Sequence, residues 1–356
     1  MRALVRLASL AMLMLLGCGR ATCEKKPGPA TSAPEPPPPP AKSEADADEP
    51  DEPDDPDESA APEPSTEEER ALLKRVNRIR RSRKVDFRAP TEAEERAYGA
   101  WVTAAIRAAR TDSPPPEGAP EGFVLERIEG APHIWLLAER QRDRRGAGAI
   151  AIRSGRAREL AVEAPHTFFD RGTLPIAAAV FEAWSARALL VNTVYRYSAL
   201  KERPAGSDER AGDEDAAAKR AAASDVAHAR RSFFQAGHEA LLAVVPGLWT
   251  VQLHGFHDDA APGVSVIVSA AGTTADAAGA ASSCRTRLGD TGVRAFPTEI
   301  GVLGGLTNVQ ARSSARAGSP FYHIEIGRSL RDRLGKDAAA RRRFAEALPA
   351  PPEASH

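Results

Sequence analysis

Short apolar segments with the length of β-strands alternate with longer helical segments from Phe123 almost to the end of the chain. A sheet covered by helices requires such alternation, so it predicts an α/β domain at 118–350 with a mixed, largely parallel sheet flanked by helices. Strands are predicted at 123–128, 133–139, 147–153, 159–164, 187–194, 248–254, 263–269, 292–296 and 320–326. Helices are predicted at 173–186, 224–245, 273–288 and 328–347. The polar run at 200–222 interrupts this order and is predicted to be an exposed insertion near the functional site.

A small helical preface is predicted to precede the sheet at 67–112. Apolar residues recur there at helical spacing, first at Leu72, Leu73, Val76 and Ile79, and then at Tyr98, Trp101, Val102 and Ile106. Thr91 is the predicted N-cap of the second helix, because acidic residues follow in its first turn. Consecutive prolines at 114–116 remove backbone donors, so the connection at 111–122 is predicted to be a loop.

The first residues of the chain have the features of an export signal. Arg2 and Arg6 precede an apolar run at 7–16 that is too short to span a bilayer but suits the core of a signal peptide. The run ends in Leu-Leu-Gly-Cys18, which resembles the bacterial lipobox, where the signal is cleaved before a lipidated cysteine. We therefore predict a lipoprotein signal peptide at 1–17 and lipid on Cys18, while an ordinary cleaved signal with a chance cysteine stays open as the alternative. The predicted location is the bacterial cell envelope, anchored by this lipid on the periplasmic side of the outer membrane.

Residues 18–66 are predicted to form a disordered tether, because a proline run at 36–40 and a long acidic tract contain almost no large apolar residues. The whole chain has a formal net charge of only -1, so an arginine-rich remainder balances the acidic tether. The basic runs at 78–84 and 341–343 are predicted to lie on solvated helix faces, with binding of an anionic envelope polymer as the alternative. An exported protein is not expected to bind nucleic acid. Three cysteines without framework spacing exclude a disulfide scaffold and a cysteine-based metal site. The sequence does not determine the oligomeric state.

Four polar side chains fall at or near the ends of predicted strands, namely His166, Asp170, His254 and Glu325. Ligands of open α/β sheets bind at the carboxyl ends of strands, where residues far apart in sequence meet. Two imidazoles and a carboxylate form a ligand set that zinc accepts, and a further carboxylate can serve as the base of a hydrolytic reaction. These residues therefore predict a hydrolytic zinc site.

Structural explanations compete with this prediction for each residue. His166 can hydrogen-bond its own loop while Asp170 caps a turn. His254 can be a satisfied core histidine. Glu325 can form a salt bridge with Arg328 or Arg331.

A further cluster supplies candidates for binding substrate, namely Asn192, Arg196, Asp225, His228 and Arg230. Guanidinium groups can bind carboxylates through two hydrogen bonds, so the two arginines predict a substrate with a free carboxylate. Asp225 can instead be the N-cap of a helix, with His228 facing the first turn of that helix, and both explanations stay open.

Three segments carry a resemblance to a known family. The segment APHTFFDRGT (164–173) is similar to the zinc-binding motif of poly-γ-glutamate hydrolases, VQLHGF (251–256) resembles their later histidine-bearing strand, and FYHIEIGRSLRD (321–332) resembles their closing strand. The same arrangement resembles, more distantly, zinc carboxypeptidases and N-formylglutamate amidohydrolases. The resemblance implies that His166, Asp170 and His254 bind Zn²⁺ and that Glu325 is the general base. Asp170 stands where the family has glutamate, in a loop that is one residue shorter.

The sequence thus predicts a lipid-anchored envelope zinc hydrolase that cleaves an amide bond. Its predicted substrate is peptide-like and carries a carboxylate, as γ-glutamyl or cell-wall peptide material does. The alternative is a non-catalytic envelope lipoprotein that retains the fold as a binding or scaffold module, and a periplasmic binding protein is a second alternative. The zinc content of the purified protein distinguishes the enzyme from both.

Overall fold

The computed structural model describes residues 66–80, 85, 87–196, 198–199 and 223–352. The predicted signal peptide, Cys18, nearly all of the predicted tether and almost the whole predicted insertion at 200–222 lie outside the described residues. Among the helices of the described part, none is long and apolar enough to cross a membrane.

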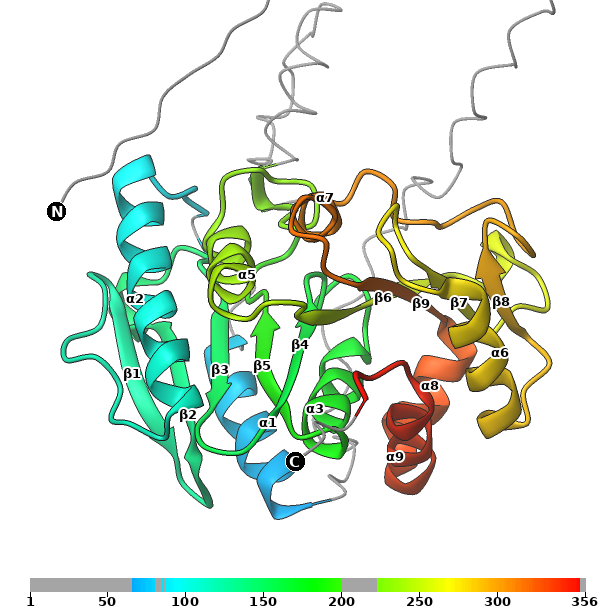
Figure 1. Cartoon of the computed structure of the whole chain (residues 1–356), viewed down its shortest axis with the longest axis horizontal. Helices are drawn as coiled ribbons and strands as arrows, with labels where there is room; N and C mark the ends of the chain where they lie inside the picture. The colour runs from blue at the N-terminus through cyan, green and yellow to red at the C-terminus, as the bar shows by residue number, and fades with distance from the viewer. Residues whose placement is uncertain (1–65, 81–84, 86, 197, 200–222, 353–356) are drawn as a thin grey trace, which may run out of the picture. The chain divides into compact units, whose positions relative to one another are not determined.

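A nine-stranded mixed sheet forms the centre of the fold, with the strand order β1-β2-β3-β5-β4-β6-β9-β7-β8 (Figure 1). The strands are β1 (Phe123–Ile128), β2 (Ala131–Glu139), β3 (Ala149–Arg153), β4 (Arg158–Ala164), β5 (Ala186–Val191), β6 (Trp249–Phe256), β7 (Val266–Ser269), β8 (Val293–Phe296) and β9 (Phe321–Gly327). Each overlaps a predicted strand. The central strands β5, β4, β6 and β9 pair in parallel, and β8 is parallel to β7. The pairings β1–β2, β2–β3, β3–β5 and β7–β9 are antiparallel, so the mixed α/β fold is confirmed but the sheet is less parallel than predicted.

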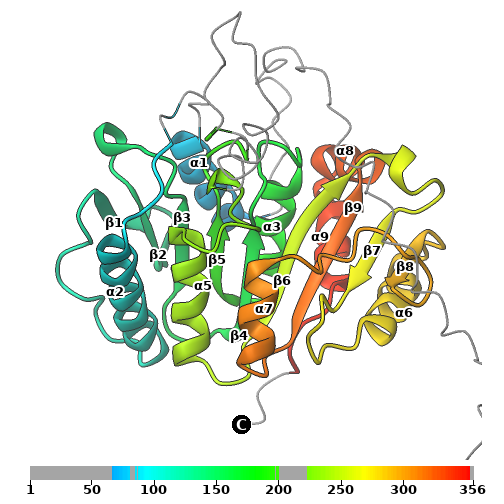
Figure 2. The same cartoon turned by 90° about the horizontal axis from the view of Figure 1, so that it is seen from above.

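Helices cover both faces of this sheet. They are α1 (Glu67–Arg80), α2 (Glu92–Arg110), α3 (Thr173–Ala183), α5 (Phe233–Val244), α6 (Ala277–Leu288), α7 (Val309–Arg316), α8 (Arg328–Lys336) and α9 (Ala338–Ala347). Figures 1 and 2 show α2, α5 and α7 on one face and α1, α3, α8 and α9 on the other. The predicted preface is part of this packing, because apolar residues of α1 join the core under α3 and those of α2 join the core under α5.

Side-chain alternation along the central strands separates an apolar face from a polar one. In β6, Val251 and Leu253 belong to the apolar core under α3, whereas Gln252 and His254 point to the α5 and α7 side. In β9, Ile324 belongs to the same apolar core and Glu325 is buried on the other face. The face under α5 and α7 therefore contains the polar side chains from which a site can be built.

Two predicted helices differ from the structure, and one helix was missed. The helix predicted at 224–245 begins at Phe233, after Ser232, whose hydroxyl accepts a hydrogen bond from the Gln235 backbone. The helix predicted at 328–347 is broken at Asp337, whose carboxylate accepts from the Ala340 backbone and caps α9. The short helix α7 was not predicted.

Arg341 is buried, although the basic run at 341–343 was predicted to be solvated. Its side chain is fully buried, and its Nε lies 3.1 Å from Oε1 of Glu69, which is equally buried. Its Nη1 donates to the Leu334 carbonyl at 2.8 Å. The Arg341–Glu69 pair therefore joins α9 to α1 through the interior, while Arg342 and Arg343 are exposed as predicted.

Candidate metal site

The loop between β4 and α3 brings His166 and Asp170 to the carboxyl end of the parallel strands. The Asp170 backbone donates to the His166 carbonyl at 2.7 Å, which closes a tight turn. Gly172 ends this turn in the left-handed region with φ of 87°, a conformation that favours glycine, and α3 starts at Thr173. The local turn therefore points both side chains to the same end of the sheet.

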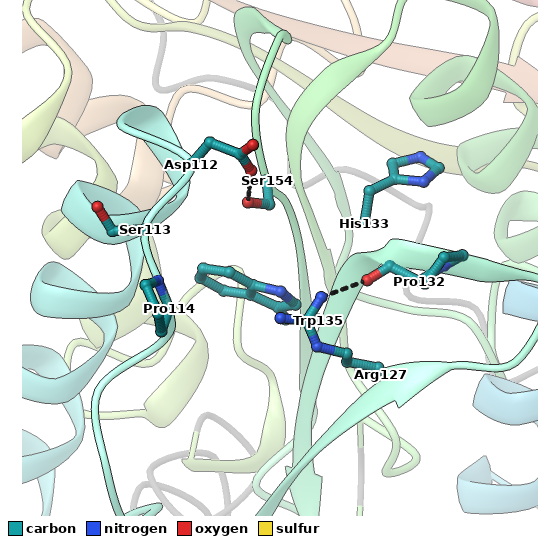
Figure 3. Close-up of a pocket in the computed structure, with 8 residues that line it drawn as sticks. All are labelled: Asp112, Ser113, Pro114, Arg127, Pro132, His133, Trp135 and Ser154. Carbon is teal, nitrogen blue, oxygen red and sulfur yellow. Dashed lines mark hydrogen bonds between the residues drawn. The ribbon is translucent and has the colours of Figure 1, made fainter.

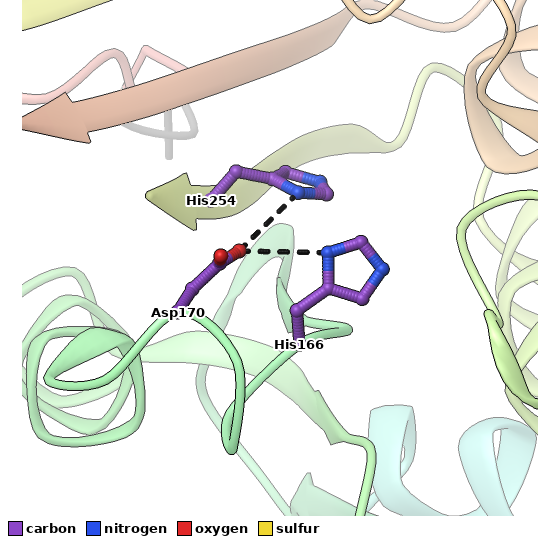
Figure 4. Close-up of side chains that lie close together, drawn as sticks. All are labelled: His166, Asp170 and His254. Atoms are coloured by element: carbon purple, nitrogen blue, oxygen red, sulfur yellow. Dashed lines mark ion pairs between the residues drawn. The ribbon is translucent and has the colours of Figure 1, made fainter. Parts of the chain in front are cut away.

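Figure 4 shows Asp170 between the two imidazoles of His166 and His254. Asp170 Oδ2 lies 3.5 Å from His166 Nδ1 and 3.7 Å from His254 Nδ1. All three side chains are buried, and the two rings are nearly perpendicular, with centroids 4.9 Å apart. Ligand bonds of about 2.0–2.2 Å in a tetrahedral zinc site separate neighbouring ligand atoms by roughly 3.4 Å. The two distances from Asp170 Oδ2 are therefore close to this spacing, and one ligand atom from each of the three residues lies within 4.8 Å of the other two.

The hydrogen bonds around this cluster also fit a metal. Asp170 Oδ2 is buried yet accepts no hydrogen bond from any described residue. The Nε2 atoms of the two imidazoles are engaged elsewhere, 2.8 Å from Asp225 Oδ1 for His166 and 2.7 Å from Gln252 Oε1 for His254. Both rings can thus present Nδ1 to a cation beside the carboxylate, a donor set of nitrogen and oxygen that suits Zn²⁺.

The two imidazoles have opposite charge preferences. Burial lowers the pKa of His166, but the charge of Asp225 and the hydrogen bonds to Asp170 and Asp225 together raise it to about 9. Burial acts to raise the pKa of Asp225, yet the charge of His166, then that of Arg196, holds it well below its ordinary value. Burial and then the charge of His323 hold the pKa of His254 far below its ordinary value. In the metal-free protein His166 is therefore protonated at neutral pH, whereas His254 is neutral.

Glu325 lies beside His254 on the neighbouring strand β9, in direct register with it. Its Oε1 is 3.0 Å from His323 Nε2, while its buried Oε2 has no hydrogen-bond partner among the described residues. The His323 ring lies against the His254 ring, with centroids 4.3 Å apart and planes 32° apart. Arg331 donates instead to the carbonyls of residues 326, 171 and 256. Glu325 is thus a buried carboxylate with one free oxygen at the edge of the His166–Asp170–His254 cluster.

Among the predicted substrate-binding residues, Asn192 and Arg196 have different surroundings. Asn192 is buried, and its Nδ2 donates to the Pro165 and Val194 carbonyls, so its amide holds the loop that carries His166. Arg196 is half-buried and donates from Nε and Nη2 to Oδ2 of Asp225, at 3.1 and 2.6 Å. Its guanidinium lies 4.9 Å from the centroid of the Phe169 ring.

His228 and Arg230 follow Asp225 in an irregular segment and are both exposed. His228 Nδ1 is 3.3 Å from the Thr307 hydroxyl. The segment that carries Asp225 has no cap role in α5, because Ser232 caps that helix. Asp225 therefore joins His166 to Arg196, and the exposed Arg230 lies five residues beyond it in the chain.

A separate cavity of about 290 Å³ lies near the start of β2 and the end of β3 (Figure 3). It is lined by Asp112, Ser113, Pro114, Arg127, Pro132, His133, Trp135 and Ser154. Two hydrogen bonds join residues of its lining, from the Ser154 hydroxyl to Asp112 at 2.8 Å and from Arg127 Nη1 to the Pro132 carbonyl at 2.8 Å. None of the residues predicted for the metal site lines it.

Sequence reasoning did not single out Gln252, Asn308 or His323 as functional residues. Their signal was weak: a glutamine and a histidine each stand two residues before a candidate site residue on a buried strand. In strands, residues two apart share a face, so such neighbours are expected to contact the same site.

No family model matches this sequence, and no curated protein matches it. Among solved structures, the chain is similar to an N-formylglutamate amidohydrolase from Ralstonia eutropha JMP134, with 14% sequence identity, a TM-score of 0.35, and coverage of 57% of this chain and 95% of that one. It is also similar to a bacteriophage poly-γ-glutamate hydrolase, with 14% identity, a TM-score of 0.33, and coverage of 57% and 86%. A metallo-carboxypeptidase from Burkholderia cenocepacia shares 12% identity, with a TM-score of 0.30 and coverage of 73% and 67%. These scores are too low to carry an argument about activity, which rests on the residues of the site.

Proposed function

We propose that this protein is a zinc-dependent hydrolase that cleaves an amide bond in a peptide-like substrate carrying a free carboxylate. One observation carries the proposal: the Nδ1 atoms of His166 and His254 converge on a buried oxygen of Asp170 that accepts no hydrogen bond from the described residues. On the adjacent strand, Glu325 also has a buried carboxylate oxygen without a hydrogen-bond partner in the described part of the chain. Hydrolytic zinc sites require these components together.

His166, Asp170 and His254 would hold the metal. Zinc, when bound, polarises a carbonyl oxygen and lowers the pKa of water to about 7. His323 holds one oxygen of Glu325, so the free oxygen is available to take a proton from water and return it to the leaving amine. Glu325 is therefore the proposed general base and general acid.

Arginine side chains near the site would bind the carboxylate of the substrate. Arg196 is anchored by Asp225 and is only half-buried, and Arg230 is exposed in the same region of the chain. A guanidinium fork pairs with a carboxylate through two parallel hydrogen bonds. Substrates of the γ-glutamyl or cell-wall peptide type supply such a carboxylate next to an amide.

The proposed location is the bacterial envelope, through lipid on Cys18. Cys18→Ser should move the protein from the detergent phase to the aqueous phase in Triton X-114 partitioning, because the lipid anchor is lost. Wild type and mutant that both stay in the aqueous phase would show that no anchor is attached.

Amide hydrolysis by the full chain tests the proposed activity. Wild type should cleave at least one γ-glutamyl or muropeptide amide, should lose activity to a chelator and should regain it with zinc. Glu325→Gln should lower turnover by about 10²–10⁴-fold, as expected for a lost general base, without loss of zinc. Glu346→Gln changes an exposed carboxylate on α9 and should leave turnover unchanged. Turnover that is unchanged by the chelator, or unchanged in Glu325→Gln, would contradict the mechanism. Folded protein that binds zinc but shows no turnover would favour a binding module.

A further inference from the structure

A buried chain of polar side chains leads from His254 to α5 and α7. Gln252 lies next to His254 on the same face of β6, and it contacts Glu163 on β4 and Asn308 at the start of α7. We propose that Asn308 and Gln252 are positioning residues that fix the tautomer of His254, with the proton on Nε2 and Nδ1 free to bind a metal. This inference rests on the proposed function, since it concerns a ligand of the proposed zinc site.

Glu163 fixes the orientation of the Gln252 amide from one side. Gln252 donates from Nε2 to Glu163 Oε2 at 2.8 Å, and both side chains are completely buried. A carboxylate only accepts hydrogen bonds, so the amide atom that faces Glu163 must be the nitrogen. The other amide atom, which faces His254, is therefore the oxygen.

Asn308 fixes the same orientation independently. As the N-cap of α7 it accepts a hydrogen bond at Oδ1 from the Ala311 backbone N–H, at 3.0 Å. A backbone N–H only donates, so the remaining atom of the Asn308 amide is the nitrogen, which donates to Gln252 Oε1. The hydrogen bonds to Glu163 and to Asn308 therefore each require that Gln252 Oε1 faces His254.

This arrangement determines the tautomer of the His254 imidazole. His254 Nε2 lies 2.7 Å from Gln252 Oε1 and must carry the proton that it donates. Nδ1 then has its lone pair toward Asp170 Oδ2, at 3.7 Å. The hydrogen bond on the far nitrogen thus sets which nitrogen can bind a metal.

Side chains of α5 and α7 hydrogen-bond to Glu163 and Gln252, at the end of this polar chain farther from His254. His238 on α5 lies with Nδ1 2.7 Å from Glu163 Oε1 and with Nε2 3.1 Å from the Ser314 hydroxyl of α7. Gln310 of α7 lies with Oε1 3.3 Å from Gln252 Nε2 and donates from Nε2 to the Val226 carbonyl at 2.9 Å. Since Val226 follows the aspartate that pairs with His166, α7 is connected to the surroundings of both imidazoles.

Asn308→Asp tests the assignment in the full chain. Aspartate keeps the size of the side chain and the oxygen that caps α7, but it replaces the donor to Gln252 with an acceptor. The Gln252 amide is then repelled or turned, and His254 loses its fixed acceptor. We expect the Kd for zinc, measured with zinc alone in competition with a chelating dye, to rise by about 10–100-fold. Asp276→Asn, which changes the cap of the distant α6, should leave the Kd unchanged.

A double substitution provides the matching positive control. Gln252→Glu together with Glu163→Gln exchanges donor and acceptor between these two positions, yet it still places an acceptor toward His254. This pair of changes should keep the Kd within a few-fold of wild type. Gln252→Glu alone places two carboxylates face to face in the interior and should lower the melting temperature.

¹⁵N chemical shifts of histidine in the metal-free chain report the tautomer directly. Wild type and the double substitution should show His254 protonated on Nε2, and Asn308→Asp should not. A purely structural role would lower the melting temperature of Asn308→Asp while leaving both the tautomer and the zinc Kd unchanged, and would overturn the inference. His254 protonated on Nδ1 in wild type would also overturn it. Wild type that binds no zinc would instead contradict the proposed function, whichever tautomer is found.

Discussion

Asp225→Asn is expected to change how the stability of the metal-free protein depends on pH. In wild type, burial lowers the pKa of His166, but the Asp225 carboxylate 2.8 Å from its Nε2, with a hydrogen bond to Asp170, raises it from 6.5 to about 9. Asparagine retains an oxygen that accepts from Nε2 but removes the negative charge. Burial and the positive charge of Arg196 then outweigh the remaining hydrogen bond to Asp170, and the pKa of His166 should fall below its ordinary value.

The direction of the effect follows from the raised pKa. A histidine whose pKa is higher in the folded state stabilises the fold below the unfolded-state pKa of 6.5, and this contribution is lost as the pH rises through about 9. Each pKa unit corresponds to about 1.4 kcal/mol, so the pair contributes about 3 kcal/mol to the free energy of unfolding at its maximum. The depressed pKa of Asp225 acts only at acid pH and lies outside this window.

Urea unfolding in the presence of a chelator measures this contribution. Between about pH 6 and about pH 9.5, wild type should lose roughly 3 kcal/mol relative to Asp225→Asn. Equal pH profiles for the two proteins would refute the assignment of the charge to His166.

Zinc binding should depend on the same proton. The metal replaces a proton on His166, so its affinity should rise about tenfold per pH unit from pH 6.5 to about 9. A histidine with an ordinary pKa would confine this dependence to acid pH. Calorimetry in buffers of different ionisation enthalpy should show that wild type releases about one proton more than Asp225→Asn near pH 7.

Two further substitutions test the buried contacts of Arg341 and Arg331. Arg341→Met should lower the free energy of unfolding by about 3–5 kcal/mol, because it removes the guanidinium that pairs with the buried Glu69 carboxylate. Urea unfolding should show that adding Glu69→Leu restores most of the loss. Gly255→Ala should lower the free energy of unfolding by about 1–3 kcal/mol, because the new methyl group overlaps the Arg331 guanidinium and displaces it from three carbonyls. Gly335→Ala has open space and should show no such loss. An unchanged midpoint for Arg341→Met or for Gly255→Ala would contradict the corresponding account.

The strands could be predicted from the sequence because their apolar runs are local signals. Val251 and Leu253, for example, alternate with Gln252 and His254, which fixes both the strand and its two faces. The turn from His166 to Asp170 is equally local, so the meeting of these side chains with a strand-end histidine could be proposed without coordinates.

The remaining features depend on partners that are distant in sequence. The helix α7 has no apolar stripe, because its buried positions include Gln310 and Ser314, whose partners lie on other elements. Arg341 pairs with Glu69, which is 272 residues away in the sequence. The residues around Arg341 therefore did not indicate that its side chain is buried. Asn192 was predicted to bind substrate because the residues around it do not show that its amide donates to the carbonyl of Pro165, in the loop after β4.

The zinc content of the full chain tests the central claim most directly. Wild type and variants are stripped with a chelator, reloaded with zinc, freed of excess metal and measured by elemental analysis. Wild type should retain about one equivalent of zinc, and so should His133→Ala, which changes an exposed histidine of β2. His166→Ala and His254→Ala should each retain almost none. A folded wild type without zinc, or full retention in either of these two variants, would contradict the metal site proposed here.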